Sequence, residues 1–346
     1  GTNSINNFPI TKNSYQPANL YKNQAGFLLK IDTVSSGKAS LVYGTFLGGN
    51  SDELDFGTEA FAVDIGEIGY AYITGRTNSN IGFPITNTAF QPIYPGGYSS
   101  AFLIKIDTES YGGLGLIYGT YIGGNGLDEG LALAVDINQC IYITGATSSQ
   151  RGFPITKSSY QQEFKGGFYS AYLLKIDTKV SGINGLVYGS YFGGNGDDYG
   201  TAIVIDENRY VYLTGYTNSI VDFPISKAAY EATLESGCNA SYLVKLDTRL
   251  KGEKALLYST YLSLNEANIA LDIAVDKNYN AYISGIMAET AEDISQAGEC
   301  YCAYVIKVNT LVCDLVLNEE VSSNIINIGG KIQWHLLHWM LRSSVR

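Results

Sequence analysis

The chain has 346 residues, a length that suits one large repeat domain or two ordinary domains. Its composition, 45% hydrophobic and 16% charged with 39 glycines, excludes a disordered chain and favours strands and turns over helices. The formal net charge of −11 argues against nucleic acid as a partner, because affinity for phosphate backbones comes from clustered Lys and Arg. No apolar run reaches the roughly 18 to 20 residues of a membrane-spanning helix, so no membrane span is expected.

A repeat runs along the chain with a spacing of 70 residues, which is longer by five in the first copy. Each copy opens on the tripeptide FPI and continues through a K-x-D-T element, a YGTYxGGN-like element, an AVD-like element and an ITG-like element. The copies of FPI begin at Phe8, Phe83, Phe153 and Phe223, and the YGTY-like elements begin at Tyr43, Tyr118, Tyr188 and Tyr258. The aspartates of the K-x-D-T elements are Asp32, Asp107, Asp177 and Asp247, and those of the AVD-like elements are Asp64, Asp136, Asp206 and Asp276. The ITG-like elements end at Gly75, Gly145, Gly215 and Gly285.

Four short apolar runs lie in each copy, and residues 101–146 show them as AFLIKID, LIYGTYI, LALAVD and CIYITGA. These runs are rich in Ile, Val, Leu, Tyr and Thr and are separated by Gly, Asn, Asp and Ser, a pattern that predicts strands. The FPI segment between the fourth run and the next first run is long for a hairpin. We expect it to run over the outside or one rim and to carry the chain from one blade to the next, with its proline in an extended edge.

Both faces of the predicted strands are mainly apolar, so each sheet needs a neighbouring sheet on either side. This pattern predicts an all-β protein, a β-propeller of four-stranded blades with about five blades in this chain. The alternative, a parallel β-helix, usually has much shorter coils. We expect one propeller domain over residues 1–346, with clear repeats over 8–285 and a degenerate last blade or cap over 286–346.

The repeat becomes irregular after Gly285, where no further FPI occurs. AYVIKVNT still matches the first strand of a fifth copy. The tail over residues 311–346 contains both Trp and both His residues of the chain. Terminal units of repeat arrays are often atypical because an exposed end must be covered, so we expect the tail to close or cap the array. The alternatives are an amphipathic partner-binding segment and a poorly packed end.

The phrase AVDxNxxxYITGxTxSxxxFPIT, preceded by YGTYxGGN, resembles the bacterial β-propeller repeat family known as SBBP repeats, over about residues 8–310. The resemblance implies a propeller, usually within exported or cell-surface proteins. It implies no catalytic residues. The family is associated with seven blades, whereas this chain provides about five, which leaves open a five-bladed ring, a fragment, or closure through another copy.

Residues that recur in every copy are expected to belong to the scaffold. The K-x-D-T and AVD-like aspartates are predicted to accept backbone hydrogen bonds at turns. The tyrosines Tyr72, Tyr142, Tyr212 and Tyr282 are predicted to pack between blades with their hydroxyl groups bonded. Residues that do not recur are better candidates for a ligand site, and three arginines stand out on this ground: Arg76, Arg151 and Arg209.

Acidic residues follow the GGN elements, and such loops could supply oxygen ligands to Ca²⁺. Their spacing reproduces neither an EF-hand nor the nonapeptide calcium repeat, so solvated turn carboxylates are the alternative. No other cofactor is expected. The candidate calcium ligands are Asp52, Glu53, Asp55, Asp128, Asp197 and Asp198.

An enzyme would need more catalytic groups than the sequence offers, because a Ser or Cys nucleophile needs an adjacent base and the only histidines are in the tail. Paired carboxylates on a propeller could still hydrolyse glycosides. Tyr, Asn and Ser are abundant, as on recognition surfaces. We therefore expect a noncatalytic, exported or cell-surface interaction module with a protein or glycan ligand. The alternatives are a structural repeat segment of a larger surface protein and a carbohydrate-active enzyme.

Overall fold

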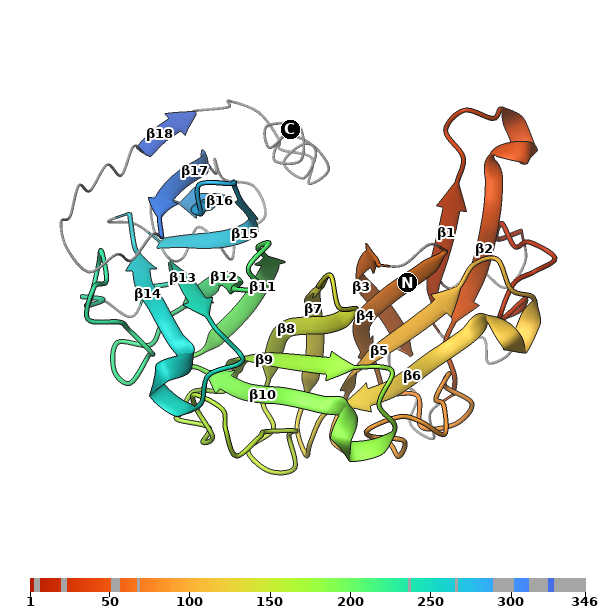
Figure 1. The fold of residues 1–346 in the computed structure, drawn as a ribbon, viewed down its shortest axis with the longest axis horizontal. Helices are drawn as coiled ribbons and strands as arrows, with labels where there is room; N and C mark the ends of the chain where they lie inside the picture. Colours follow the sequence, from red (N-terminus) through yellow and green to blue (C-terminus); the bar gives the residue numbers. More distant parts are fainter. Residues whose placement is uncertain are drawn as a thin grey trace. The chain divides into compact units, whose positions relative to one another are not determined.

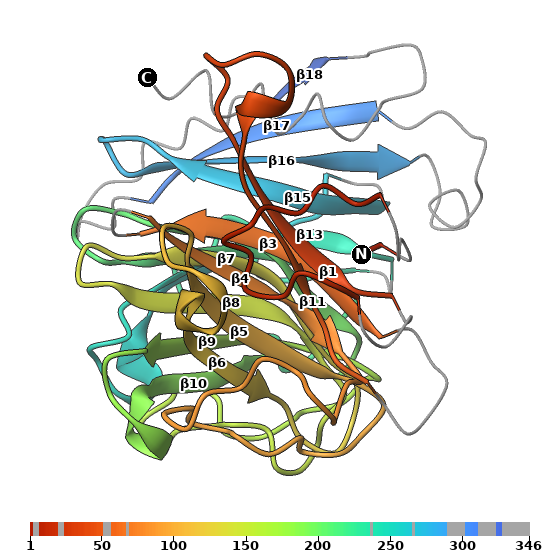
Figure 2. The same cartoon turned by 90° about the vertical axis from the view of Figure 1, so that its right-hand side faces the viewer.

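A computed structural model describes residues 1–2, 7–19, 24–50, 57–66, 69–235, 238–264, 267–288, 302–310 and 323–326. Within these residues the protein is all-β, as predicted, and its helices are four short 3₁₀ turns, η1 to η4. Antiparallel strands form one two-stranded sheet and four four-stranded sheets, and the strands of each sheet lie side by side in both views (Figures 1 and 2).

The sheets follow the order of the chain. The first sheet contains β1 (Gly26–Ile31) and β2 (Leu41–Leu47). The second contains β3 (Thr58–Ile65), β4 (Tyr70–Thr77), β5 (Ser100–Asp107) and β6 (Leu116–Ile122). The third contains β7 (Asp128–Val135), β8 (Cys140–Thr147), β9 (Ser170–Asp177) and β10 (Leu186–Phe192). The fourth contains β11 (Asp198–Ile205), β12 (Val211–Thr217), β13 (Ala240–Leu246) and β14 (Leu256–Leu262). The fifth contains β15 (Ala267–Val275), β16 (Asn280–Ala288), β17 (Cys302–Asn309) and β18 (Ser323–Ile326).

This is a β-propeller fold with four-stranded blades, and each blade combines strands from two consecutive sequence repeats. In the second sheet, β3 and β4 carry the AVD and ITG elements of one copy, whereas β5 and β6 carry the KID and YGTY elements of the next. The register places Gly75 of β4 opposite Phe102 of β5. The AYVIKVNT run forms β17 and pairs with β16, which confirms it as the corresponding strand of the last sheet.

The expected path of the FPI segment was wrong. Because β4 pairs with β5 and β12 pairs with β13, the segment joins two neighbouring strands of one sheet and does not connect successive blades. Where the connection between two sheets is fully described, it is a short loop that contains the GGN element, such as residues 123–127 between β6 and β7.

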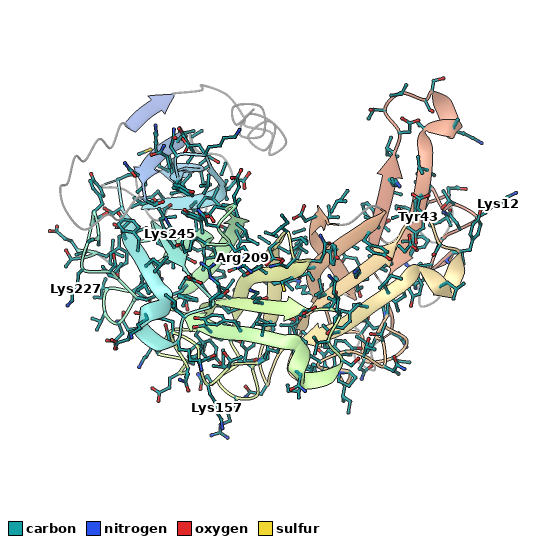
Figure 3. The ribbon with its side chains drawn as sticks, in the orientation of Figure 1. Lys12, Tyr43, Lys157, Arg209, Lys227 and Lys245 are labelled. Atoms are coloured by element: carbon teal, nitrogen blue, oxygen red, sulfur yellow. The ribbon has the colours of Figure 1, made fainter. Side chains whose placement is uncertain are left out.

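The FPI segment runs along the outermost strand of its own sheet. The amide of Thr86 donates to the carbonyl of Gly119 at 3.0 Å, and the amide of Phe90 donates to the hydroxyl of Tyr118 at 3.1 Å. The same tyrosine contact recurs in other copies, for example between the Tyr43 hydroxyl and the Tyr15 amide (Figure 3). The extended, proline-containing edge predicted for this segment is confirmed, because it pairs with the outside of the sheet.

The repeated aspartates act at turns, as predicted, except Asp64, which lies within β3 and accepts from the amides of Ile65 and Val135. Asp107 Oδ1 accepts from the amide of Glu109, and Asp136 Oδ1 accepts from the amides of Asn138 and Cys140, all at 2.9 Å. The predicted role of the repeated tyrosines is also confirmed, because the hydroxyl of Tyr142 donates to Asp136 Oδ2 at 3.3 Å.

A lysine on the third strand of each four-stranded sheet was not predicted; it is buried in three of these sheets and half-buried, as Lys307, in the last. Lys245 on β13 (Figure 3) is 6% exposed, its Nζ donates to the carbonyl of Thr310 at 3.1 Å, and burial lowers its pKa. Its ammonium group lies 5.1 Å from the ring centre of Tyr212, a cation–π contact that compensates part of the lost hydration. Equivalent contacts join Lys105 to Tyr72, Lys175 to Tyr142 and Lys307 to Tyr282.

The chain divides into two compact units, and the single-domain expectation stays a prediction. One unit has a core built around Leu28, Tyr43, Phe102 and Ile104, and the other around Tyr212, Leu243, Ile283 and Tyr304. No helix long and apolar enough to cross a membrane occurs in the described part of the chain. The first unit comprises Gly1–Ile143, Thr147–Pro154 and Leu174–Val187, and the second comprises Thr144–Ala146, Ile155–Leu173 and Tyr188–Arg346.

Replacing Gly119 by Ala should destabilise the protein by about 1 to 3 kcal/mol, because the new Cβ would lie 1.9 Å from the carbonyl oxygen of Pro84 in the FPI segment. Gly113→Ala is the matched control, since nothing lies within 4 Å of its Cβ position. Urea unfolding of both variants checks the prediction, which fails if the two variants are equally stable.

Candidate aromatic binding site

Four aromatic side chains contact one another in a row beside the start of β11, the first pair edge to face, the second pair tilted and the third pair stacked. The ring centres are 4.8 Å apart between Phe168 and Tyr169, 5.0 Å between Tyr169 and Tyr199, and 4.6 Å between Tyr199 and Tyr216. The last pair is nearly parallel, with 14° between the ring planes. We call Phe168, Tyr169, Tyr199 and Tyr216 the aromatic stack.

Strand pairing places one half of the aromatic stack. Tyr199 on β11 and Tyr216 on β12 are opposite each other in the antiparallel register, so their side chains lie on the same face of the sheet. The backbone of Tyr199 is held in turn by the buried hydroxyl of Tyr242, which donates to the Tyr199 carbonyl at 2.9 Å. The sheet therefore fixes the position of these two rings.

A tight loop ahead of β9 places the other half. Gly167 has a φ of +68°, and a Cβ there would lie 2.0 Å from the carbonyl oxygen of Gly196, so the chain needs glycine at this point. Asp197 Oδ1 accepts hydrogen bonds from the amides of Phe168 at 2.5 Å and Tyr169 at 3.0 Å. This carboxylate holds the loop so that Phe168 and Tyr169 continue the row of rings.

The aromatic stack presents apolar ring area together with polar groups at the surface. Phe168 is 66% exposed and the three tyrosines are half-buried. Rings that are already packed against each other lose little conformational entropy when a ligand binds, and this favours their use in recognition. The arrangement suits a flat ligand with an apolar face and hydroxyl groups at its edge.

The aromatic stack belongs to one repeat only. The positions 70 residues earlier hold Tyr98, Ser99, Glu129 and Ala146, which cannot form a row of rings. Sequence reasoning missed the stack because it searched for unmatched charged residues. The signal was present in the sequence as aromatic residues at positions where the preceding copy has small or acidic ones.

Arg76, a predicted ligand-binding residue, lies on β4 between two glutamates of its own unit. Its Nε lies 2.6 Å from Glu59 Oε2 on β3, and its Nη1 also forms an ion pair with Glu129 on β7. The guanidinium group lies 5.7 Å from the ring centre of Phe61. These contacts hold the side chain within the scaffold, and its role in binding a ligand stays a prediction.

The other two predicted arginines lie on different elements and are not brought together with the aromatic stack by any contact within the described residues. Arg151 is exposed in the segment after β8, where its amide donates to Asn125 Oδ1 at 3.0 Å. Arg209 occupies the turn between β11 and β12 with a φ of +66° (Figure 3). Gln139 and Tyr279 adopt the same conformation in the equivalent turns, so this backbone geometry is a property of the repeat.

Two of the predicted calcium ligands, Asp128 and Asp198, are fully buried in equivalent hydrogen-bond networks. Asp198 Oδ1 accepts from the hydroxyls of Thr217 at 2.5 Å and Ser219 at 2.9 Å, while Oδ2 accepts from the amide of Gly194 at 2.9 Å. Burial raises the pKa of Asp128 to about 6 and that of Asp198 to about 7. These networks close the GGN loops against the first strand of the next sheet.

Calcium binding stays a prediction. Asp197 uses one carboxylate oxygen to hold the Phe168 loop, and Asp52, Glu53 and Asp55 lie outside the described residues. Within the part of the chain that is described, no group of three or more His, Cys, Asp or Glu residues is placed to hold a metal ion. Comparing the thermal melting temperature with and without a calcium chelator tests whether the loop that contains Asp52, Glu53 and Asp55 binds calcium.

Residues 187–224 match the family model described as SBBP, a beta-propeller repeat. Over these residues the chain matches one SBBP β-propeller repeat. The matched segment begins in β10, continues through β11 and β12, and ends at the next FPI element, so it includes Tyr199 and Tyr216. The SBBP repeat as defined by sequence therefore spans two sheets, in agreement with the strand pairing.

No curated protein matches the chain. Among solved structures, it is similar to one described as the crystal structure of a GH43_12 retrieved from capybara gut metagenome, with 11% sequence identity and a TM-score of 0.30. The match covers 84% of this chain and 48% of the other, so this chain spans about half the length of that structure.

The two buried carboxyl groups should make stability fall as the pH rises from about 4 to about 7. Their folded-state pKa values exceed the unfolded value of about 3.9, so the folded state binds these protons up to a higher pH than the unfolded state does. The resulting stabilisation of the folded state is complete when the pH is below about 3.9. Above that pH, each carboxyl group lowers the free energy of unfolding by about 1.4 kcal/mol per pH unit, until the pH exceeds the pKa of that group in the folded state.

Urea unfolding between pH 4.5 and 8 measures this dependence for the natural protein and for Asp128→Asn and Asp198→Asn. Each substitution removes one titrating group and should make the dependence on pH weaker. An unchanged slope in both variants would contradict the assignment of the raised pKa values to these carboxyls.

Proposed function

We propose that this SBBP-repeat protein is a noncatalytic binding module whose ligand contacts the aromatic stack. The observation that carries the proposal is a row of four aromatic rings in contact that occurs in one repeat and leaves Phe168 66% exposed. An exposed ring does not contribute to the hydrophobic core, so packing does not account for Phe168. The preceding repeat has no aromatic residue at three of the four equivalent positions, so the scaffold does not require these rings.

A glycan is the ligand that the chemistry of the aromatic stack favours. A sugar ring has an apolar C–H face that packs on an aromatic ring, and its hydroxyl groups can bond to tyrosine hydroxyls or to water. Asn195 and Asn218 lie in the adjoining loops, where their Oδ1 atoms accept hydrogen bonds from the amides of Ile220 and Asp197. A protein ligand remains the alternative, because exposed aromatic side chains are also enriched in protein interfaces.

Several considerations support a noncatalytic role. Asp128 and Asp198 have strongly raised pKa values, as catalytic acids often do, but both are 0% exposed and bonded to Thr and Ser hydroxyls. We propose that they stabilise the GGN loops. We further propose export or attachment to the cell surface, which rests on the resemblance of the repeats to SBBP repeats.

A glycan array followed by titration calorimetry tests the proposal. Phe168→Ala should weaken binding of the ligand found on the array by about tenfold, because it removes the most exposed ring of the stack. Tyr98→Ala is the matched control, since Tyr98 is 55% exposed at the equivalent position of the preceding repeat.

Equal binding by both variants would contradict the placement of the ligand on the aromatic stack. Hydrolysis of a bound glycan would contradict the noncatalytic role. No ligand on the array and no protein partner in a pull-down would favour the alternative of a structural repeat segment.

A further inference from the structure

Asp197 places a negative charge at a position that is uncharged in the other copies of the repeat. The equivalent residues are Gly57, Leu127 and Ala267. The local structure is otherwise the same, because the amides of Asp197 and Gly57 both donate to an asparagine Oδ1, that of Asn218 and that of Asn78. The charge is therefore not part of the repeated scaffold, and it occurs in the same copy as the aromatic stack.

An uncharged acceptor is sufficient to hold the loop ahead of the third strand. In the preceding copy, Tyr98 takes the position of Phe168, and its amide donates to the backbone carbonyl of Gly126 at 3.1 Å. Beside the aromatic stack, Asp197 Oδ1 takes over this role by accepting from the amides of Phe168 and Tyr169. The negative charge of Asp197 is thus not needed to hold the loop.

The second carboxylate oxygen of Asp197 is available for a ligand. The side chain is half-buried next to the backbone of Phe168 and Tyr169, which carry the first two rings of the aromatic stack. Within the described residues, Oδ2 accepts no hydrogen bond, and no Lys or Arg forms an ion pair with Asp197. Aromatic rings and a carboxylate oxygen therefore lie together at the start of β11.

The surrounding charges favour a cationic ligand. In the segment ahead of β9, the charges of Glu163 and Lys165 compensate each other, because their side chains form an ion pair at 3.4 Å. Asp222, in the loop that follows β12, adds an exposed negative charge. The faces of aromatic rings also attract cations, and complementary charge stabilises a bound ligand.

We propose that the ligand of the aromatic stack is a glycan of amino sugars whose amino groups are not acetylated. This inference rests on the proposed function, because it takes the stack as a glycan site. The C–H face of one sugar packs on the rings, and the ammonium group at its edge donates a hydrogen bond to Asp197 Oδ2. An acetylated amino group is uncharged and does not gain this contact.

Titration calorimetry of the whole chain with two oligosaccharides tests the proposal. The probes are an oligomer of about six glucosamine units and the N-acetylated oligomer of the same length, at about pH 5.5, where amino groups are protonated. A calcium chelator is present, so that no metal ion bridges the ligand to Asp197. The glucosamine oligomer should bind about tenfold or more tightly, because its hydrogen bond to the carboxylate is charge-assisted, and added salt should reduce the difference.

Asp197→Asn should reduce the ratio of the two affinities to about one. Asparagine keeps an acceptor oxygen for the amides of Phe168 and Tyr169 but carries no charge. Glu207→Gln is the matched control, since Glu207 is exposed in the turn at the other end of β11, and the same loss of charge there should leave the ratio unchanged. If Asp197→Asn does not fold, the two oligomers and the natural chain still decide between the outcomes.

Equal affinities of the natural chain for the two oligomers, both weakened by Phe168→Ala, would overturn the preference for an amino sugar and leave the glycan-binding function in place. Affinities that Phe168→Ala does not change would contradict the proposed function itself. An equal loss of the ratio in Asp197→Asn and Glu207→Gln would assign the effect to net charge and overturn the role of Asp197.

Two further results would also overturn the proposal. The first is the absence of binding by the glucosamine oligomer. The second is tighter binding of a tetralysine peptide than of this oligomer, with the same dependence on Phe168 and Asp197, which would mean that a basic protein segment occupies the site.

Discussion

The pairing of the ITG strand of one repeat with the KID strand of the next is the interaction on which the rest of the structure depends. Because Gly75 lies opposite Phe102, and Gly215 opposite Tyr242, a residue without a side chain faces a large aromatic ring across the sheet. No single repeat can form a blade alone, since its two pairs of strands belong to different sheets. The FPI segment, which is much longer than a hairpin turn, spans this junction and protects the outermost strand.

This division of each blade between two repeats separates scaffold from variable positions. The turn aspartates, the third-strand lysines and the outermost tyrosines recur in most blades because the same strand pairing is repeated along the chain. Positions at the ends of the first two strands are free to differ: Glu59 and Arg76 form an ion pair where Tyr199 and Tyr216 form a stack. The same backbone thus presents charged residues in one blade and aromatic residues in another.

Local features of the fold could be predicted from the sequence, and the partners of each strand could not. Apolar runs bounded by Gly and Asn identified the strands correctly, as AFLIKID identified β5. Whether a blade is made from one repeat or from two depends on which strands pair with each other. The repeat in the sequence does not reveal this pairing, because both arrangements recur with the same spacing along the chain. For this reason the FPI segment was expected to connect blades.

The candidate site was predicted less well, for a different physical reason. Arg76 was singled out because it does not recur, but its charge is matched by Glu59 and Glu129 from two other strands. Tyr169 and Tyr199 are 30 positions apart in the sequence and meet only because Asp197 holds the loop ahead of β9 against β11. Likewise, the burial that raises the pKa of Asp198 follows from a network closed by Ser219, 21 residues away.

A disulfide across β4 and β5 tests the pairing of successive repeats most directly. Tyr70 and Asp107 are opposite each other in the register, and opposed residues of antiparallel strands have Cα separations compatible with a disulfide. In a chain whose five natural cysteines are replaced by serine, Tyr70→Cys combined with Asp107→Cys should form an intramolecular disulfide under mild oxidation, identified by mass spectrometry. Failure of these two cysteines to pair in the folded protein would contradict the account that each blade is built from two repeats.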